Sequence, residues 1–226
     1  FVKNLIGDCM LTPSLCDSEF ALLDINREKL YLAEGMLKNL NRNVNGGRAT
    51  VKAYESQREA LAGADFVINA IQVGGYDPCI INDFEIPLKY GLRQTYADTL
   101  GIGGIMRGLR TIPVMKGITD DMEELCPNAW LLNYTNPMAI VTGAVLKSSS
   151  IKTIGLCHSV QSCTKNLMDV VGMDCTGVEY KIAGINHQAW LLEVTKDGRD
   201  LYPEIKARAA QLTEPHEDMV RYEIMK

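Results

Sequence analysis

Short apolar runs that alternate with helical segments constrain the fold of this 226-residue chain more than any other feature. Runs typical of buried strands lie at residues 20–25, 49–54, 65–71, 129–133 and 151–156. Segments with helical spacing lie at about residues 26–40, 58–61 and 106–125, with another expected after Pro137. Strands that alternate with helices imply a parallel sheet with right-handed crossovers. We therefore expect an α/β fold, followed at residues 178–195 by a β-rich segment that leaves the parallel pattern.

Composition narrows the functional class. The net charge is −5 and the Lys and Arg residues are scattered, which argues against a nucleic-acid or anionic-membrane surface. No apolar run approaches the roughly 18 residues of a membrane span, and no signal-peptide pattern is present. Seven cysteines without a Cys-x-x-Cys pair favour reduced thiols over a disulfide framework. We expect a cytoplasmic protein with a small-molecule partner, without nucleic-acid or membrane partners.

Polar side chains follow three of the expected strands within about 55 residues, a pattern typical of an active site. Cys157 and His187 offer a thiolate and an imidazole, which are suitable ligands for a divalent transition metal. The segment from Asn133 to Pro137 presents amide side chains that could face a sugar or a nicotinamide ribose. From the residues alone the alternative stays open, because a single Cys is usually a small core residue and a single His a hydrogen-bonding one.

Candidate cofactor residues also lie at strand ends. Asp24, at the end of a strand, could accept hydrogen bonds from an adenosine ribose, but acids there are also common as helix caps or turn residues. Gly74 and Gly75 follow the next buried strand and suit either a ligand contact or a simple turn. The segment from Gly101 to Gly104 follows no obvious strand and is weak evidence for a dinucleotide loop.

Six ordered motifs together resemble glycoside hydrolase family 4, and within it most closely the α-galactosidase, or melibiase, type. The similarity covers essentially the whole chain. The motifs are Ile71-Gln-Val-Gly-Gly-Tyr76, Gly91-Leu-Arg-Gln-Thr95, Asp98-Thr-Leu-Gly-Ile-Gly-Gly104, Asn133-Tyr-Thr-Asn-Pro-Met138, Gly155-Leu-Cys-His-Ser-Val-Gln161 and Ala183-Gly-Ile-Asn-His187. The resemblance implies a Rossmann-like parallel sheet, similar to lactate and malate dehydrogenases, followed by the start of an α+β substrate domain.

The resemblance also implies a redox route to hydrolysis, an exception to the usual pair of carboxylates. In this family NAD takes a hydride from C3 of the sugar, and the ketone so formed acidifies the proton on C2. Mn²⁺ or another divalent metal stabilises the resulting charge as a Lewis acid. Loss of the C1 substituent, addition of water and return of the hydride complete the reaction. The expected substrates are α-galactosides similar to melibiose.

The family's functional residues map onto this sequence position by position. Its metal ligands fall on Cys157 and His187, and its substrate-binding Asn falls on Asn136. The acid that raises the basicity of the family's tyrosine base falls on Asp98. The proton donor of phospho-glucosidase members is an Asp, and His158 stands there in this chain. A neutral-pH imidazole can serve as acid or base.

The cofactor residues map in the same way. Asp24 matches the acid at the end of the second strand, and Asn69 with Gln72 to Gly74 matches the strand end that lines NAD. Phospho-glycoside members carry an Arg that grips the 6-phosphate around position 82, where this chain has Asn82. This departure implies a substrate that is not phosphorylated. We also expect the enzyme to form a homodimer or homotetramer.

Two parts of the family pattern are missing from the sequence. In the family a first strand and a Gly-x-Gly-Ser turn precede the position of Phe1, and the general base lies beyond Lys226. We therefore expect residues 1–157 to form an NAD-binding domain without its first strand, and residues 158–226 to begin a truncated substrate domain. By itself such a fragment should be inactive.

Other functions remain open at this point. Within the family, α-glucosidase and α-galacturonidase activities are alternatives, because no residue here reads the C4 or C6 substituent. A 2-hydroxy-acid dehydrogenase is another, since Asn136-Pro137 after a strand also resembles lactate and malate dehydrogenases. A non-catalytic sugar-binding module is the alternative from another class.

Overall fold

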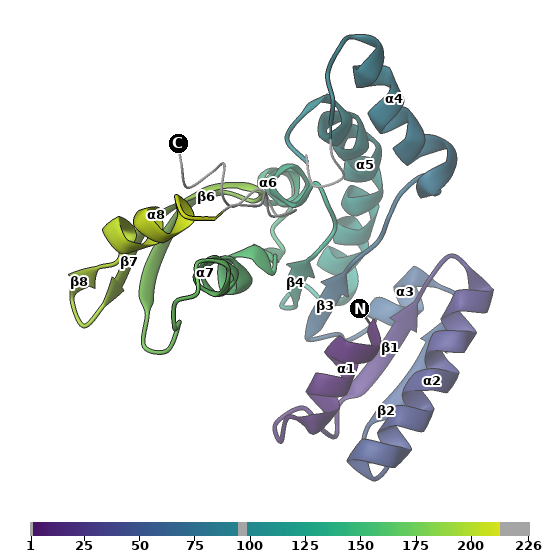
Figure 1. The fold of residues 1–226 in the computed structure, drawn as a ribbon. Helices are drawn as coiled ribbons and strands as arrows, with labels where there is room; N and C mark the ends of the chain where they lie inside the picture. The colour runs from purple at the N-terminus through teal and green to yellow at the C-terminus, as the bar shows by residue number, and fades with distance from the viewer. Residues whose placement is uncertain (1, 95–98, 213–226) are drawn as a thin grey trace. The chain divides into compact units, whose positions relative to one another are not determined.

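The computed structural model describes residues 2–94 and 99–212 (Figure 1). By their internal contacts these residues form two compact units. The first contains the chain up to Asn69, Ile112–Leu132 and Gly143–Ile154, and the second contains Ala70–Thr111, Asn133–Thr142 and the chain from Gly155 onward. The domain boundary expected at residue 157 stays a prediction.

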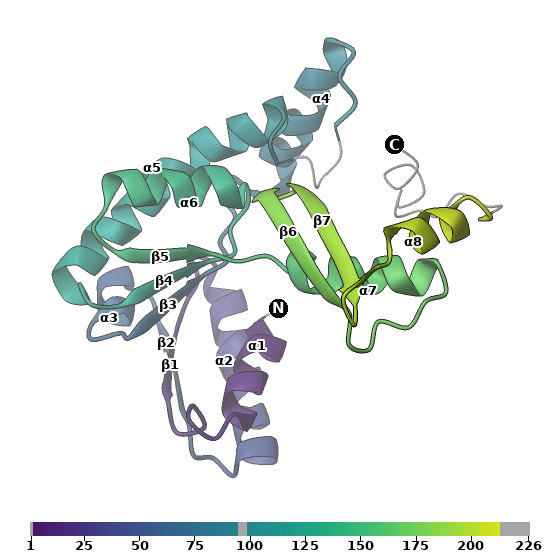
Figure 2. The ribbon, with the colours of Figure 1, turned by 90° about the vertical axis from the view of Figure 1, so that its left-hand side faces the viewer.

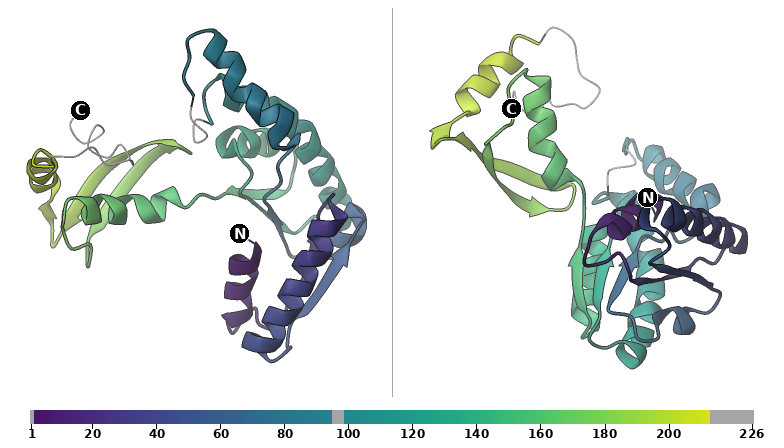
Figure 3. Two further views of the ribbon diagram at one scale, coloured as in Figure 1. Left: turned by 45° about the vertical axis from the view of Figure 1, so that its right-hand side comes forward. Right: turned by 90° about the horizontal axis from the view of Figure 1, so that it is seen from below.

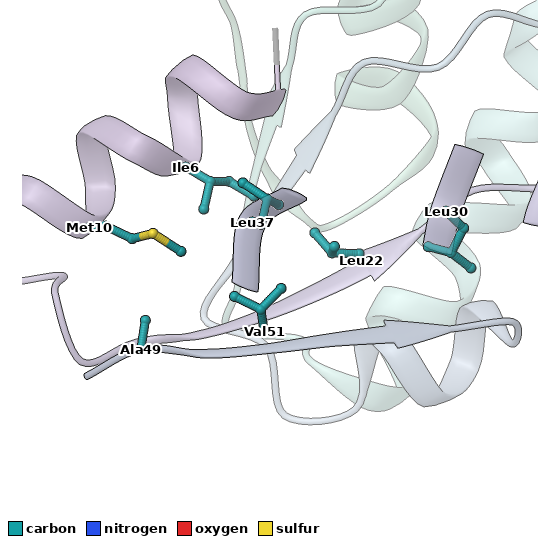
Figure 4. Packing of buried hydrophobic residues seen from close by; sticks show 7 residues of the cluster. All are labelled: Ile6, Met10, Leu22, Leu30, Leu37, Ala49 and Val51. Carbon is teal, nitrogen blue, oxygen red and sulfur yellow. The ribbon is translucent and has the colours of Figure 1, made fainter. Parts of the chain in front are cut away.

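The chain begins with helices packed on a small parallel sheet. Its elements are α1 (Val2–Leu11), β1 (Glu19–Leu23), α2 (Arg27–Asn45), β2 (Thr50–Tyr54) and α3 (Gln57–Leu61). Strands β1 and β2 pair in parallel, with Glu19 opposite Thr50. One apolar cluster fixes α1 and α2 on this sheet, as Figure 4 shows for Ile6, Met10, Leu22, Leu30, Leu37, Ala49 and Val51. Helix α2 is the crossover between the two strands, as the alternating pattern predicted.

The turns at the N-terminal end of α2 explain why the first strand is shorter than expected. The Asn26 side chain caps the helix by accepting from the Lys29 N–H at 3.0 Å. Asp24 in turn accepts from the Asn26 N–H at 2.8 Å. These two turns stop the strand at Leu23, so the prediction that it continues to Ile25 was wrong, and the Ile25 side chain is fully exposed.

A second sheet of three strands has the order β3-β4-β5, with helical connections between its strands (Figure 2). Its strands are β3 (Phe66–Asn69), β4 (Trp130–Asn133) and β5 (Lys152–Gly155). The connecting elements are the irregular turn η1 (Gly75–Ile80), α4 (Ile81–Lys89), α5 (Ile102–Leu125) and α6 (Met138–Ser148). The expected alternation of strands and helices is confirmed. Helix α5 begins four residues earlier than predicted, so Gly103 and Gly104 lie in a helix and not in a loop.

The remainder is the predicted β-rich segment, formed as an antiparallel sheet with helices. Its elements are α7 (Ser159–Val170), β6 (Glu179–Ile185), β7 (Gln188–Lys196), β8 (Arg199–Asp200) and α8 (Tyr202–Ala209). Leu167 and Met168 of α7 share an apolar cluster with Val194 of β7 and Ile205 of α8. Figure 3 shows α7 lying along the β6–β7 hairpin. Among the described residues, no helix combines the length and apolar character needed to cross a membrane.

Candidate metal and sugar site

Cys157 lies at the junction between β5 and α7. The N–H of Leu156 donates to the Asn133 carbonyl at 2.9 Å, so pairing with the β4 end continues to the residue before the cysteine. Helix α7 then begins at Ser159, whose hydroxyl oxygen lies 3.2 Å from the Cys157 sulfur and whose N–H donates to it at 3.5 Å. The first turn of a helix therefore surrounds the thiol with donors.

His187 lies in the two-residue turn of the β6–β7 hairpin, since Ile185 pairs with Gln188. Its φ of 64° is in the left-handed region, which is uncommon for a residue other than glycine. The turn brings the His187 Nε2 to 3.6 Å from the Cys157 sulfur, and the Nδ1 to 3.1 Å from the Thr99 hydroxyl. Two predicted ligands thirty residues apart in sequence thus meet, and their role as metal ligands stays a prediction.

The surroundings of Cys157 favour its thiolate form. Partial burial raises the pKa of this thiol, but its hydrogen bonds with the Ser159 hydroxyl and N–H, with His187 and with Asn186 outweigh burial. The net effect lowers the pKa of Cys157 from 9.0 to about 7. Because the thiolate is the form that binds metals, this residue is ready to act as a ligand near neutral pH.

The geometry of the pair fits a divalent metal ion. The sulfur and the nitrogen lie 3.6 Å apart, close enough for one divalent ion to contact both. Next to them the Asn186 Oδ1 is buried without a hydrogen-bond partner among the described residues. Within residues 2–94 and 99–212, no group of three or more His, Cys, Asp or Glu side chains gathers to hold a metal. Two protein ligands leave coordination positions open for substrate oxygens, as a catalytic metal requires.

The loops after β3, β4 and β5 meet beside this pair. The Thr135 hydroxyl after β4 donates to the Ile71 carbonyl after β3 at 3.0 Å. The Tyr134 ring lies 5.9 Å from the His158 ring, centroid to centroid, so the predicted proton donor faces the β4 loop. Asn136, the predicted sugar ligand, accepts from the Met138 N–H at 3.2 Å and thereby begins α6. A hydrogen bond thus joins the loops after β3 and β4, and a ring contact joins those after β4 and β5.

The predicted cofactor residues lie in two settings. Asp24 forms the turn before α2, and the buried Asn69 amide donates to the Met115 sulfur at 3.1 Å. Gln72 and Gly74 lie in the loop after β3, where Gln72 is exposed and Gly74 has φ 90°. Their role toward NAD stays a prediction. Asp98, predicted as a catalytic residue, lies outside the described residues.

Sequence reasoning missed two residues that hold the Gly74 loop. Arg110 donates to the Val73 carbonyl at 3.3 Å and forms a two-pronged ion pair with Asp83, at 3.2 and 2.7 Å. The carboxylate raises the pKa of Arg110 and keeps its charge fixed. A Cβ on Gly74 would lie 2.6 Å from the Cys79 sulfur and 3.1 Å from the Arg110 Nε, so only glycine fits. The partners are 27 residues apart on two helices, a separation that carries no sequence signal.

Comparisons with known proteins show which family the chain is similar to. The "Family 4 glycosyl hydrolase" model matches residues 1–173, and the model of its C-terminal domain matches residues 182–226. An α-galactosidase from Bacillus subtilis (strain 168) is 59% identical over 226 residues, covering 100% of this chain and 52% of that protein. The chain therefore spans about half the length of this relative.

Solved structures show the same fold. A 6-phospho-β-glucosidase from Thermotoga maritima, solved with manganese, NAD⁺ and glucose-6-phosphate, is 28% identical with a TM-score of 0.76, covering 91% of this chain and 48% of that one. A lactate dehydrogenase from Eimeria maxima, at 16% identity and a TM-score of 0.62 over 99% of this chain and 62% of its own, shares the fold alone. The predicted Rossmann-like α/β class is confirmed. Because the two family models match almost all of the sequence, the chain belongs to glycoside hydrolase family 4, as its six motifs predicted.

Proposed function

We propose that the protein hydrolyses α-galactosides that carry no phosphate, with NAD and a divalent metal ion, Mn²⁺ in the first instance. The observation that carries the proposal is the convergence of Cys157 and His187, because a thiolate and an imidazole 3.6 Å apart with an open side suit a catalytic metal. A plain 2-hydroxy-acid dehydrogenase has no use for such a pair, and family membership argues against it.

Cys157 and His187 would hold the metal, and Ser159 supports that role by keeping the sulfur ionised. The ion, when bound, supplies Lewis-acid stabilisation of negative charge on sugar hydroxyl oxygens. His158 follows the cysteine directly and is exposed, so its imidazole can reach a glycosidic oxygen and give it a proton as the aglycone leaves.

Asn136 is assigned to the sugar. Its Oδ1 is engaged by the Met138 N–H, which fixes the orientation of the amide and directs the role of donor to its NH₂ group. Such a donor can bind a sugar hydroxyl. Gln72 and Gly74 are assigned to the nicotinamide side, in the loop that Arg110 and Asp83 hold, and Asp24 and Asn69 to the rest of NAD.

The proposed sugar specificity rests on the similarity to an α-galactosidase and on one residue that differs from phospho-glycoside members of the family. The relative at 59% identity is an α-galactosidase. Position 82, on α4, carries an exposed Asn where phospho-glycoside members carry an Arg, which favours a sugar without a phosphate. A cytoplasmic homodimer or homotetramer is part of the same proposal.

The test uses the full-length protein. Cys157→Ser and His187→Ala should each abolish Mn²⁺ uptake and turnover of an aryl α-galactoside while leaving the far-UV circular dichroism spectrum unchanged. The matched control is Cys163→Ser, which removes an exposed thiol from α7, the helix that follows Cys157, and should leave both properties intact. Full activity in both site variants, and after chelation, would refute the metal site.

A second measurement separates the redox route from direct displacement. The enzyme should require NAD without consuming it, and product formed in heavy water should carry deuterium at C2. Product without C2 label would refute the route. Aryl α-glucoside and α-galacturonide run in parallel decide the sugar, and preferred turnover of either would overturn the α-galactoside assignment.

A further inference from the structure

The glycines from Gly101 to Gly104 have a structural purpose that their sequence pattern did not reveal. They open α5, and two of them are crossed by backbone from elsewhere in the chain. A Cβ on Gly104 would lie 2.2 Å from the Thr99 carbonyl oxygen, and one on Gly103 would lie 2.3 Å from the Asp83 carbonyl oxygen. Real Cβ contacts are essentially never shorter than 3.0 Å. Gly104 therefore allows the Thr99 backbone to lie directly against the first turn of α5, and Gly103 does the same for the Asp83 backbone.

This packing places the Thr99 side chain against a predicted metal ligand. Thr99 is buried, with 2% of its surface exposed, and its hydroxyl oxygen lies 3.1 Å from the Nδ1 of His187. The opposite nitrogen of the same ring, Nε2, lies 3.6 Å from the Cys157 sulfur. Contacts at both ring nitrogens define the rotation of an imidazole, which the broad sp³–sp² torsion of histidine leaves undefined.

The chemistry of the hydroxyl suits the tautomer that a metal needs. A histidine binds a metal through the nitrogen that carries no proton, and the proton on its other nitrogen is usually donated to a neighbouring acceptor. A threonine hydroxyl can accept such a proton. If His187 donates from Nδ1 to Thr99, the lone pair of Nε2 points to the side where the Cys157 sulfur lies.

We infer that Thr99, held by the glycines of α5, is a positioning residue that orients His187 and selects the tautomer able to bind a metal. The inference rests on the proposed function, because it requires His187 to be a metal ligand. It assigns the Asp98–Gly104 motif a role at the metal site through Thr99, in place of a dinucleotide loop.

The test compares two substitutions of Thr99 in the full-length protein, with Co²⁺ as the probe because a thiolate–cobalt bond gives an absorption band. Thr99→Val keeps the volume and loses the hydroxyl, whereas Thr99→Ser keeps the hydroxyl and loses the methyl group. Loss of an outer-shell partner typically weakens metal binding about 10- to 100-fold. We expect that loss for Thr99→Val, and for Thr99→Ser a Co²⁺ affinity within about threefold of the wild type.

A purely structural role predicts the reverse order, because a residue that only fills space tolerates Val better than Ser. Co²⁺ affinity that follows this reverse order, or that is equal in both variants, would overturn the inference. The ¹⁵N shifts of His187 report the tautomer directly and should change in Thr99→Val but not in Thr99→Ser.

Two controls complete the design. Thr119→Val makes the same change at a buried threonine whose hydroxyl bonds the Lys116 carbonyl within α5, and should leave Co²⁺ affinity unchanged. Cys157→Ser tests the metal site itself. If Cys157→Ser abolishes the thiolate–cobalt band while Thr99→Val binds normally, only the present inference fails; if Cys157→Ser retains the band, the proposed function fails with it.

Discussion

Replacing Gly104 or Gly117 by alanine makes the same chemical change at two positions of α5 with opposite expected results. In a helix interior this change stabilises by about 0.5–1 kcal/mol, because alanine loses less backbone freedom on folding. At Gly117 nothing lies within 4 Å of the added Cβ, so Gly117→Ala should show the whole gain.

At Gly104 the added Cβ would lie 2.2 Å from one backbone atom and 2.4 Å from the next, both in Thr99. Backbone cannot rotate away as a side chain can, so the cost belongs at the upper end of the roughly 1–3 kcal/mol range for overpacking. After the helix-propensity gain is subtracted, Gly104→Ala should destabilise by about 2 kcal/mol. The two variants should therefore differ by about 2–3 kcal/mol.

Urea denaturation of the full-length variants measures this difference, followed by far-UV circular dichroism. Because the displaced residue is Thr99, Gly104→Ala should also weaken Co²⁺ binding, whereas Gly117→Ala should not. Equal stability of the two variants would refute the close approach of Thr99 to α5, and normal Co²⁺ binding in a destabilised Gly104→Ala would refute its connection to His187.

Two further predictions concern the thiol and the loop after β3. In metal-free protein, alkylation of Cys157 by iodoacetamide should rise with pH through a midpoint near 7, since the pKa of this thiol is lowered from 9.0 and the thiolate dominates above the lowered value. Ser159→Ala removes the hydroxyl hydrogen bond, one of those that lower this pKa, and keeps the backbone one, so the midpoint should move upward toward 9. A midpoint that peptide-level mass spectrometry finds unchanged would contradict that cause. Asp83→Asn leaves Arg110 without its carboxylate in a largely buried site and should destabilise by about 2 kcal/mol, less than a fully buried pair would lose. If Arg110 holds the Gly74 loop for NAD, the same variant should raise the KM for NAD more than it lowers kcat, which steady-state kinetics can test.

The order of elements was accessible from the sequence because it depends on local patterns. The apolar runs of β1 to β5 and the spacing of α5 are each read within a dozen residues. The boundaries were less accessible, because they depend on specific side-chain contacts. The strand expected to reach Ile25 ends early since Asp24 and Asn26 form turns, and nothing in an apolar run announces that.

In the candidate site, too, some residues could be predicted from the sequence and others could not. Cys157 and His187 drew attention by their positions after apolar runs, but their residue types alone favoured a core residue and an ordinary hydrogen-bonding histidine. Only the family motifs made metal binding the expected role, and that role stays a prediction. Thr99, Arg110 and Asp83 were missed because their roles come from contacts between segments far apart in sequence. Gly103 and Gly104 stood out in the sequence, but their role did not. A glycine needed for close contact with another backbone segment cannot be told from a loop glycine by sequence alone.

The left-handed backbone conformation of His187 affects which residues selection would favour at this turn. A residue with a Cβ at φ 64° costs roughly 1–2 kcal/mol relative to one that tolerates this conformation. Glycine or asparagine would therefore give a more stable turn, and His187→Gly should raise the melting temperature of the metal-free protein. Histidine at this position therefore makes the turn less stable than glycine or asparagine would. Screens that select only for thermal resistance should replace this histidine early, and under the proposed function that replacement would remove a metal ligand.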